Sequence, residues 1–118
     1  MLSLQNGTAT SIPAGLWADF MAAVTYSKAS LGDLSEIWDF VAEESVFQAD
    51  RLLRRFQSKL EYLAQSDTIG RPRQELAAGC RSYPIGKFCI YYRPTVGGIE
   101  LIRLLHSARD IRRIKFPK

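Results

Sequence analysis

The sequence predicts an α+β domain in which a helical hairpin packs on one face of an antiparallel sheet. Apolar residues between positions 34 and 63 recur at steps of three and four, the period of an amphipathic helix. After position 78 apolar and polar residues alternate instead, as they do in a half-buried strand. The chain has 118 residues, of which 47% are hydrophobic and 24% charged, so it suits one folded domain rather than a disordered chain.

A short strand at residues 22–26 opens the predicted fold, because this segment is apolar and partly β-branched. Ser27 follows it and offers a side-chain oxygen to cap the next helix. The apolar stripe of that helix consists of Leu34, Ile37, Trp38 and Val41. Acidic residues occupy the other faces, so the exposed surface of this helix should be acidic.

A second helix is predicted to begin at Ser45, where the residues 45–48 fit a capping box with Gln48. Its apolar stripe consists of Ala49, Leu52, Leu53, Phe56, Leu60 and Leu63. Its exposed flank is basic and consists of Arg51, Arg54, Arg55 and Lys59. We interpret this flank as a solvated helix surface rather than a phosphate-binding stripe, because no aromatic residues interleave with it for base stacking.

Gly70 and Pro72 end the helical region, and a meander of three strands follows at residues 79–83, 87–93 and 99–106. Strict alternation in the last strand predicts that Arg103 shares a face with Ile99, Leu101 and Leu105, and that His106 shares the other with Ile102 and Leu104. The residues 110–116 form a short basic tail. No predicted element covers the second face of the sheet, so we expect that face to bind another chain.

The first 20 residues have no sustained period and contain Gly7, Pro13 and Gly15, so they are predicted to be an N-terminal extension outside the core. The domain then spans residues 21–118. A second methionine, Met21, precedes the first strand, so either Met1 or Met21 could be the biological start.

Composition excludes several classes of function. Two cysteines and one histidine predict neither a disulfide framework nor a metal site, and no cofactor-binding motif is present. The longest apolar runs are too short to span a membrane, and a signal peptide is not expected, so we expect a cytoplasmic protein. Residues 68–118 hold 11 Lys or Arg against 3 Asp or Glu, whereas residues 1–67 hold 5 against 9. The basic half suggests an acidic partner.

Four stretches of the sequence carry a resemblance to a known family. They are Tyr26-Ser27-Lys28-Ala29 with the helix start after it, Gly70-Arg71-Pro72-Arg73 with Glu75-Leu76, Cys80-Arg81-Ser82-Tyr83-Pro84 with Ile90-Tyr91-Tyr92-Arg93-Pro94, and Ile99-Glu100 through Arg103-Leu104-Leu105-His106-Ser107-Ala108-Arg109-Asp110. In this order they resemble the ParE branch of the RelE/ParE superfamily of toxins. The likeness covers roughly residues 24–114, and the order of the motifs along the chain carries it.

The resemblance implies the toxin of a bacterial type II toxin-antitoxin system, a role in plasmid stabilisation, and a cognate antitoxin of the ParD kind whose C-terminal segment folds onto the toxin. ParE members are associated with poisoning DNA gyrase, so a noncatalytic gyrase inhibitor is expected, with no recognition of nucleic-acid sequence by the toxin alone. RelE members cleave messenger RNA on the ribosome, which leaves an endoribonuclease as the alternative. A degenerate toxin that only binds its antitoxin is a third.

An endoribonuclease needs cations to neutralise phosphate and groups that move protons. The candidate residues of an endoribonuclease site are His106, Arg81, Arg93, Tyr91 and Arg109. For the favoured reading no catalytic residue is expected. The predicted contacts with antitoxin or target are then the arginines of the basic half, which are Arg71, Arg81, Arg93, Arg103, Arg109, Arg112 and Arg113.

Overall fold

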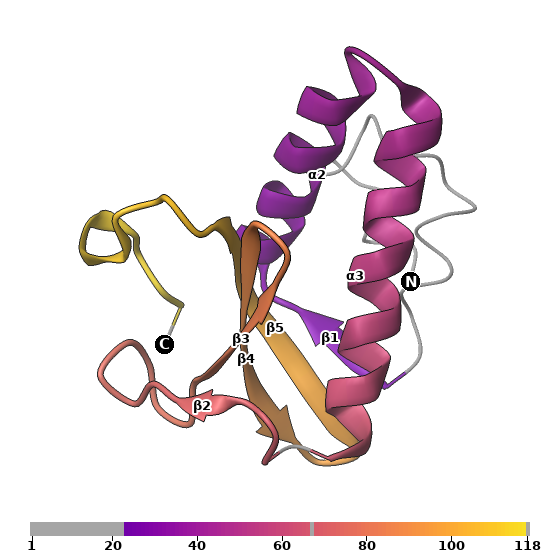
Figure 1. Cartoon of the computed structure of the whole chain (residues 1–118). Coiled ribbons are helices and arrows are strands. Elements are labelled where there is room, and N and C mark those ends of the chain that lie inside the picture. The colour runs from indigo at the N-terminus through magenta and orange to yellow at the C-terminus, as the bar shows by residue number, and fades with distance from the viewer. Residues whose placement is uncertain (1–22, 67, 118) are drawn as a thin grey trace.

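Two antiparallel helices cover one face of a five-stranded sheet in the computed structural model, which describes residues 23–66 and 68–117 (Figure 1). The strand order is β1-β5-β4-β3-β2. The elements are β1 (Val24–Tyr26), α2 (Lys28–Ala42), α3 (Val46–Gln65), β2 (Arg71–Pro72), β3 (Arg81–Ile85), β4 (Phe88–Thr95), β5 (Gly98–His106) and the 3-10 turn η2 (Ile111–Arg113). The predicted α+β class and the helical hairpin are confirmed.

The sheet is mixed, so the prediction of an antiparallel sheet is wrong at one edge. β1 pairs with β5 in parallel, with Val24 opposite Ile99 and Tyr26 opposite Leu101. The chain path explains this direction: α2 leads away from the end of β1, α3 returns, and β3 therefore starts at the same end as β1 (Figure 1). Two reversals later β5 runs in the same direction as β1. A short strand, β2, also extends the sheet where the sequence predicted only a turn.

Serine side chains begin both helices. The Ser27 hydroxyl accepts the Ser30 N–H at 3.0 Å, and the Ser45 hydroxyl accepts the Gln48 N–H at 3.1 Å. The capping box at Ser45 is only half formed, because the Ser45 N–H bonds to the carbonyl of Val41 at 3.0 Å. The Gln48 side chain is therefore not needed to complete the cap.

The main core lies between the helices and the sheet. From α3 it takes the predicted stripe, with Leu53, Phe56, Leu60 and Leu63 fully buried. From the middle strand it takes Ile90 and Tyr92, which face the helices as the alternation predicts. This packing buries most of both apolar stripes against one sheet face, and burial of that kind is the main stabilising contribution in a domain of this size.

A β-bulge in β5 reverses the predicted facing of its last residues. Tyr92 pairs with Leu101 but Tyr91 pairs with Arg103, so Ile102 is an extra residue without a partner on β4. The correction is that Leu104 packs in the helix-side core, whereas Ile102 and Leu105 pack on the opposite face. Strict alternation placed Ile102 correctly but assigned Leu104 and Leu105 to the reverse faces, because a single extra residue shifts a period of two by one step for the residues that follow it.

The second face of the sheet is covered, contrary to the prediction. A smaller core forms there around Cys80, Tyr91, Ile102 and Leu105. The covering side chains come from the loop between β2 and β3 and from the C-terminal segment, namely Leu76, Ala77, Ile111, Ile114 and Phe116. In Figure 1 this loop and the yellow C-terminal segment lie on the side of the sheet away from the helices. Segments without a regular period supply this cover, so the hydropathy pattern did not indicate it.

The predicted N-terminal extension of residues 1–20, the alternative start at Met21 and the predicted strand residue Ala22 lie outside the described residues.

Candidate functional site

Two of the predicted binding arginines hold neighbouring loops. Arg81 donates from Nη1 to the carbonyl of Gly70, in the turn before β2. Arg93 donates from Nε to Glu100 at 2.9 Å and from Nη1 to the carbonyl of Ala78 at 3.3 Å. Both guanidinium groups are therefore part of the scaffold around the β2–β3 loop.

Arg103 is also used within the molecule. It binds the carboxylate of Asp33 on α2 through two hydrogen bonds, of 2.8 Å and 2.7 Å, and donates to the carbonyl of Lys115 at 2.8 Å. The hydrogen bond and charge of Asp33 raise the pKa of Arg103. This arginine joins β5, α2 and the C-terminal segment.

The remaining predicted arginines lie at the surface. Arg71 on β2 and Arg109 and Arg113 in the C-terminal segment are exposed. Arg112 is exposed as well and pairs with Asp110 at 3.0 Å. The hydrogen bond from Arg112 lowers the pKa of Asp110. These four arginines are able to meet a partner.

The candidates for an endoribonuclease do not converge. Tyr91 lies in the core of the second face, with its ring 5.1 Å from that of Phe116. Burial raises the pKa of Tyr91 to about 12. His106 lies on the helix side, where its ring contacts that of Phe88 at 5.5 Å. The sheet separates these two groups, so they cannot act together on one bond.

His106 borders an open groove between α2, the first turns of α3 and the β3–β4 turn. Its Nδ1 accepts the N–H of Ala108 at 3.0 Å. The groove has a volume of about 450 Å³. It is lined by Glu36, Ile37, Phe40, Val41, Leu52, Lys87, Phe88 and His106.

Phe40 makes this groove unusual for a surface, because 76% of the residue is exposed. Ile37, Val41, Leu52 and Phe88 lie beside it and are only partly buried. Contiguous exposed apolar side chains of this kind mark interaction sites. Sequence reasoning missed Phe40, although its position three residues after Ile37 extends the apolar stripe of the helix.

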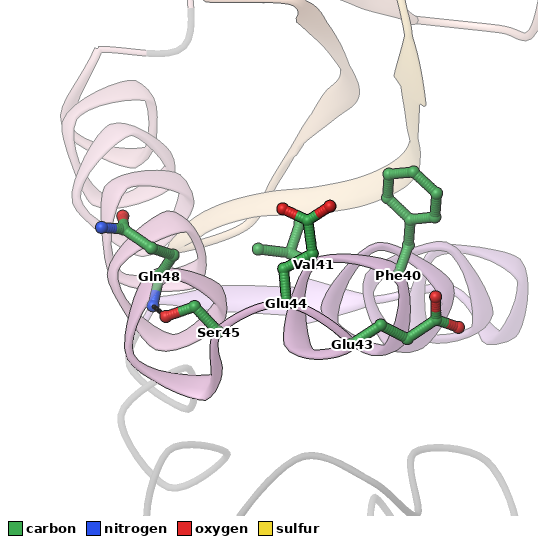
Figure 2. Close-up of a pocket in the computed structure, with 6 residues that line it drawn as sticks. All are labelled: Phe40, Val41, Glu43, Glu44, Ser45 and Gln48. Carbon is green, nitrogen blue, oxygen red and sulfur yellow. Dashed lines mark hydrogen bonds between the residues drawn. The ribbon is translucent and has the colours of Figure 1, made fainter.

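A second cavity, of about 230 Å³, continues the groove to the tip of the helical hairpin. Figure 2 shows Phe40, Val41 and Glu44 on the α2 side and Ser45 and Gln48 at the start of α3. The Gln48 amide points away from Ser45 in this view. Acidic side chains rim the α2 side of the groove, and Lys87 stands at the edge toward the sheet. An amphipathic segment with an apolar stripe fits this arrangement.

Neither cysteine is placed for nucleophilic chemistry. Cys80 is buried, and burial raises its pKa to about 11, so the thiolate is scarce near neutral pH. Burial also raises the pKa of Cys89. Within the described residues no three His, Cys, Asp or Glu side chains lie close enough together to hold a metal ion, and none of the helices described there is long and apolar enough to cross a membrane.

Comparison with known proteins gives consistent matches. Residues 24–111 match the family model described as the ParE toxin of the type II toxin-antitoxin system, parDE. The chain is 32% identical over 87 residues to Toxin ParE1 of Caulobacter vibrioides, a match that covers 73% of this chain and 90% of that protein. A solved structure titled the chromosomal ParDE TA system from P. aeruginosa matches with a TM-score of 0.58 at 19% identity, covering 74% of this chain and 97% of that one.

Proposed function

Because this chain belongs to the ParE toxin family of type II toxin-antitoxin systems, we propose that it arrests growth by binding DNA gyrase without chemistry of its own. The protein is the toxin component of such a system, as the family match over residues 24–111 shows. The observation that supports a noncatalytic mode of action is the separation of His106 and Tyr91 by the sheet. A proton-transfer mechanism needs an acid and a base on the same substrate.

The proposed contacts with gyrase include the exposed arginines of the C-terminal segment, Arg109, Arg112 and Arg113. They stand on one short segment that the smaller core anchors to the sheet through Ile111 and Ile114. Anchoring in this way holds the charges in place before binding and so reduces the entropy lost on association.

The experiment that tests this mode of action compares two assays on one preparation of the purified toxin. DNA supercoiling by gyrase should be inhibited, while ribosome-dependent cleavage of messenger RNA should stay at the level without toxin. Cleavage of messenger RNA without inhibition of gyrase would contradict the proposal and support the endoribonuclease hypothesis. Activity in neither assay would support a degenerate toxin.

The proposed site for the cognate antitoxin is the groove around Phe40. An amphipathic segment that orders on binding would bury its apolar side there, and this burial would supply most of the affinity. Acidic groups on the segment would meet Lys87 at the groove edge, and so speed association. Phe40 carries this proposal, since a phenylalanine that is 76% exposed beside further apolar side chains leaves apolar area to bury against a partner.

A Phe40→Glu variant tests the groove. The affinity for the antitoxin encoded beside the toxin gene should fall at least about tenfold, since the variant puts a charge into an apolar contact. Val96→Glu is the matched control, because Val96 is a fully exposed apolar residue in the β4–β5 turn. Equal affinities of the two variants would place the antitoxin elsewhere.

A further inference from the structure

Three cationic side chains lie in a row on α3, and none of them forms an ion pair with a described carboxylate. We call Arg51, Arg55 and Lys59 the α3 ridge. They are four residues apart, so they line up on one side of the helix at steps of about 6 Å. Among residues 23–66 and 68–117 no carboxylate lies within ion-pair distance of any of the three.

The two carboxylates of α3 are engaged elsewhere. Asp50 accepts the indole N–H of Trp38 at 2.8 Å, and Glu61 accepts the side-chain amide of Gln57 at 3.3 Å. The contrast with the sheet is clear, because Arg93 and Arg103 both pair with carboxylates there. Free positive charge is therefore found on α3, although the front half of the sequence is acidic overall.

Aromatic rings hold both ends of the α3 ridge. The Arg51 guanidinium lies 5.8 Å from the centroid of the Phe47 ring. The Lys59 ammonium lies 4.9 Å from the centroid of Tyr62 and 5.3 Å from that of Tyr83. Cation–π contacts orient a charged group without neutralising it. These rings lie at the two ends of the ridge and do not interleave with its cations.

A small cavity of about 150 Å³ lies at the N-terminal end of the ridge. It is lined by Gln48, Arg51, Leu52 and Arg55, so guanidinium and amide groups dominate it. The Gln48 amide is available because the half-formed cap at Ser45 does not use it. Two guanidinium groups beside an amide suit the oxygens of a phosphate.

We propose that the α3 ridge binds the phosphodiester backbone of duplex DNA, without reading its sequence. Cations in a straight row neutralise neighbouring phosphates, and contacts of that kind carry no sequence information. An acidic peptide is less suitable, because its affinity would need an apolar anchor and the ridge cavity contains one apolar side chain, Leu52. The proposal holds whether or not gyrase is the target.

The test measures binding of the full chain to a fluorescent duplex of about 20 base pairs by anisotropy, at several salt concentrations. The triple variant R51Q/R55Q/K59Q should bind at least about tenfold more weakly at 0.1 M salt, and its slope of log K against log salt should be lower by about 2 to 3. The control K28Q/K115Q/K118Q removes the same charge from positions outside α3 and outside the proposed contacts, and should bind within about twofold of the parent.

Equal losses in the two triple variants would overturn the proposal, since net charge alone would then explain binding. Competition by poly-glutamate as effective as competition by unlabelled duplex would also overturn it, because the ridge would then bind acidic protein segments. If the ridge triple fails to fold by circular dichroism, Arg55→Gln alone should still lower the salt slope by about 0.9. The assay contains no gyrase and no antitoxin, so its result is independent of the proposed function.

Discussion

The carboxylate of Asp33 accepts two hydrogen bonds from the guanidinium of Arg103, at 2.7 Å and 2.8 Å, across the boundary between α2 and β5. Asp33 also accepts the backbone N–H of Leu104 at 3.0 Å. Its side chain is 7% exposed and that of Arg103 15%. One nearly buried ion pair thus fixes the helical hairpin to the strand that carries the bulge.

Replacing Asp33 by Asn should destabilise the fold by about 3 kcal/mol, because it leaves a nearly buried guanidinium without a counter-charge. The measurement is the free energy of unfolding in urea. The exposed pair of Asp110 and Arg112 supplies the control, and Asp110→Asn should leave the unfolding midpoint unchanged. Similar midpoints for the two variants would show that Asp33 is not a structural link.

The helices and the main core could be predicted from the sequence because both depend on local periods. The stripe from Leu53 to Leu63 and the cap at Ser27 are properties of neighbouring residues, and the structure has both. The class of the protein followed from the order of short motifs, and the family match over residues 24–111 confirms it.

The sequence-based predictions were wrong where the structure depends on residues that are far apart in the sequence. Ile102 is an extra residue only in relation to β4, and no local pattern marks it. The direction of β1 relative to β5 depends on the whole path between them. Partners of the arginines are also nonlocal, since Asp33 and Arg103 are far apart in the sequence. The groove around Phe40 forms between the two helices and the sheet, and could not be found from any one of these elements.

Gly70 sits against Tyr92, and a larger residue should not fit there. The Tyr92 hydroxyl accepts the N–H of Gly70 at 2.8 Å, and a Cβ on Gly70 would lie 2.5 Å from that oxygen. Gly70→Ala should destabilise the fold by about 1–3 kcal/mol in a urea titration.

Gly32→Ala is the control for this substitution. Nothing lies within 4 Å of a Cβ at this helical position, so this variant should be more stable by about 0.5–1 kcal/mol. Equal effects of the two substitutions would contradict the packing argument.

Stability should fall as the pH rises from 9 to about 11, because burial raises the pKa of Cys80 from 9.0 to about 11. Over that range the unfolded chain has lost the thiol proton and the folded chain keeps it, so the folded state binds more protons and is weakened by rising pH. The contribution is fully present below pH 9. Urea midpoints across this range measure it.

Cys80→Ala separates this effect from other titrations. The variant loses a constant amount of stability through packing, but its midpoint should depend less on pH between 9 and 11 than that of the parent. Parallel curves for parent and variant would show that Cys80 does not titrate differently in the two states.

Growth arrest should survive the loss of each group able to transfer a proton in the candidate set. His106→Gln keeps a polar side chain of similar size but cannot ionise near neutral pH, and Tyr91→Phe removes the phenol from the opposite face of the sheet. A toxin that acts by contact should keep its activity in cells without antitoxin, whereas an endoribonuclease that used either group should lose about 10²-fold or more of its activity.

Removing the charges of Arg109, Arg112 and Arg113 together should instead weaken growth arrest, because these exposed arginines are the proposed contacts with gyrase. Circular dichroism serves as the control for folding. The endoribonuclease hypothesis would be favoured if folded His106→Gln lost growth arrest while the variant without the charges of Arg109, Arg112 and Arg113 kept it.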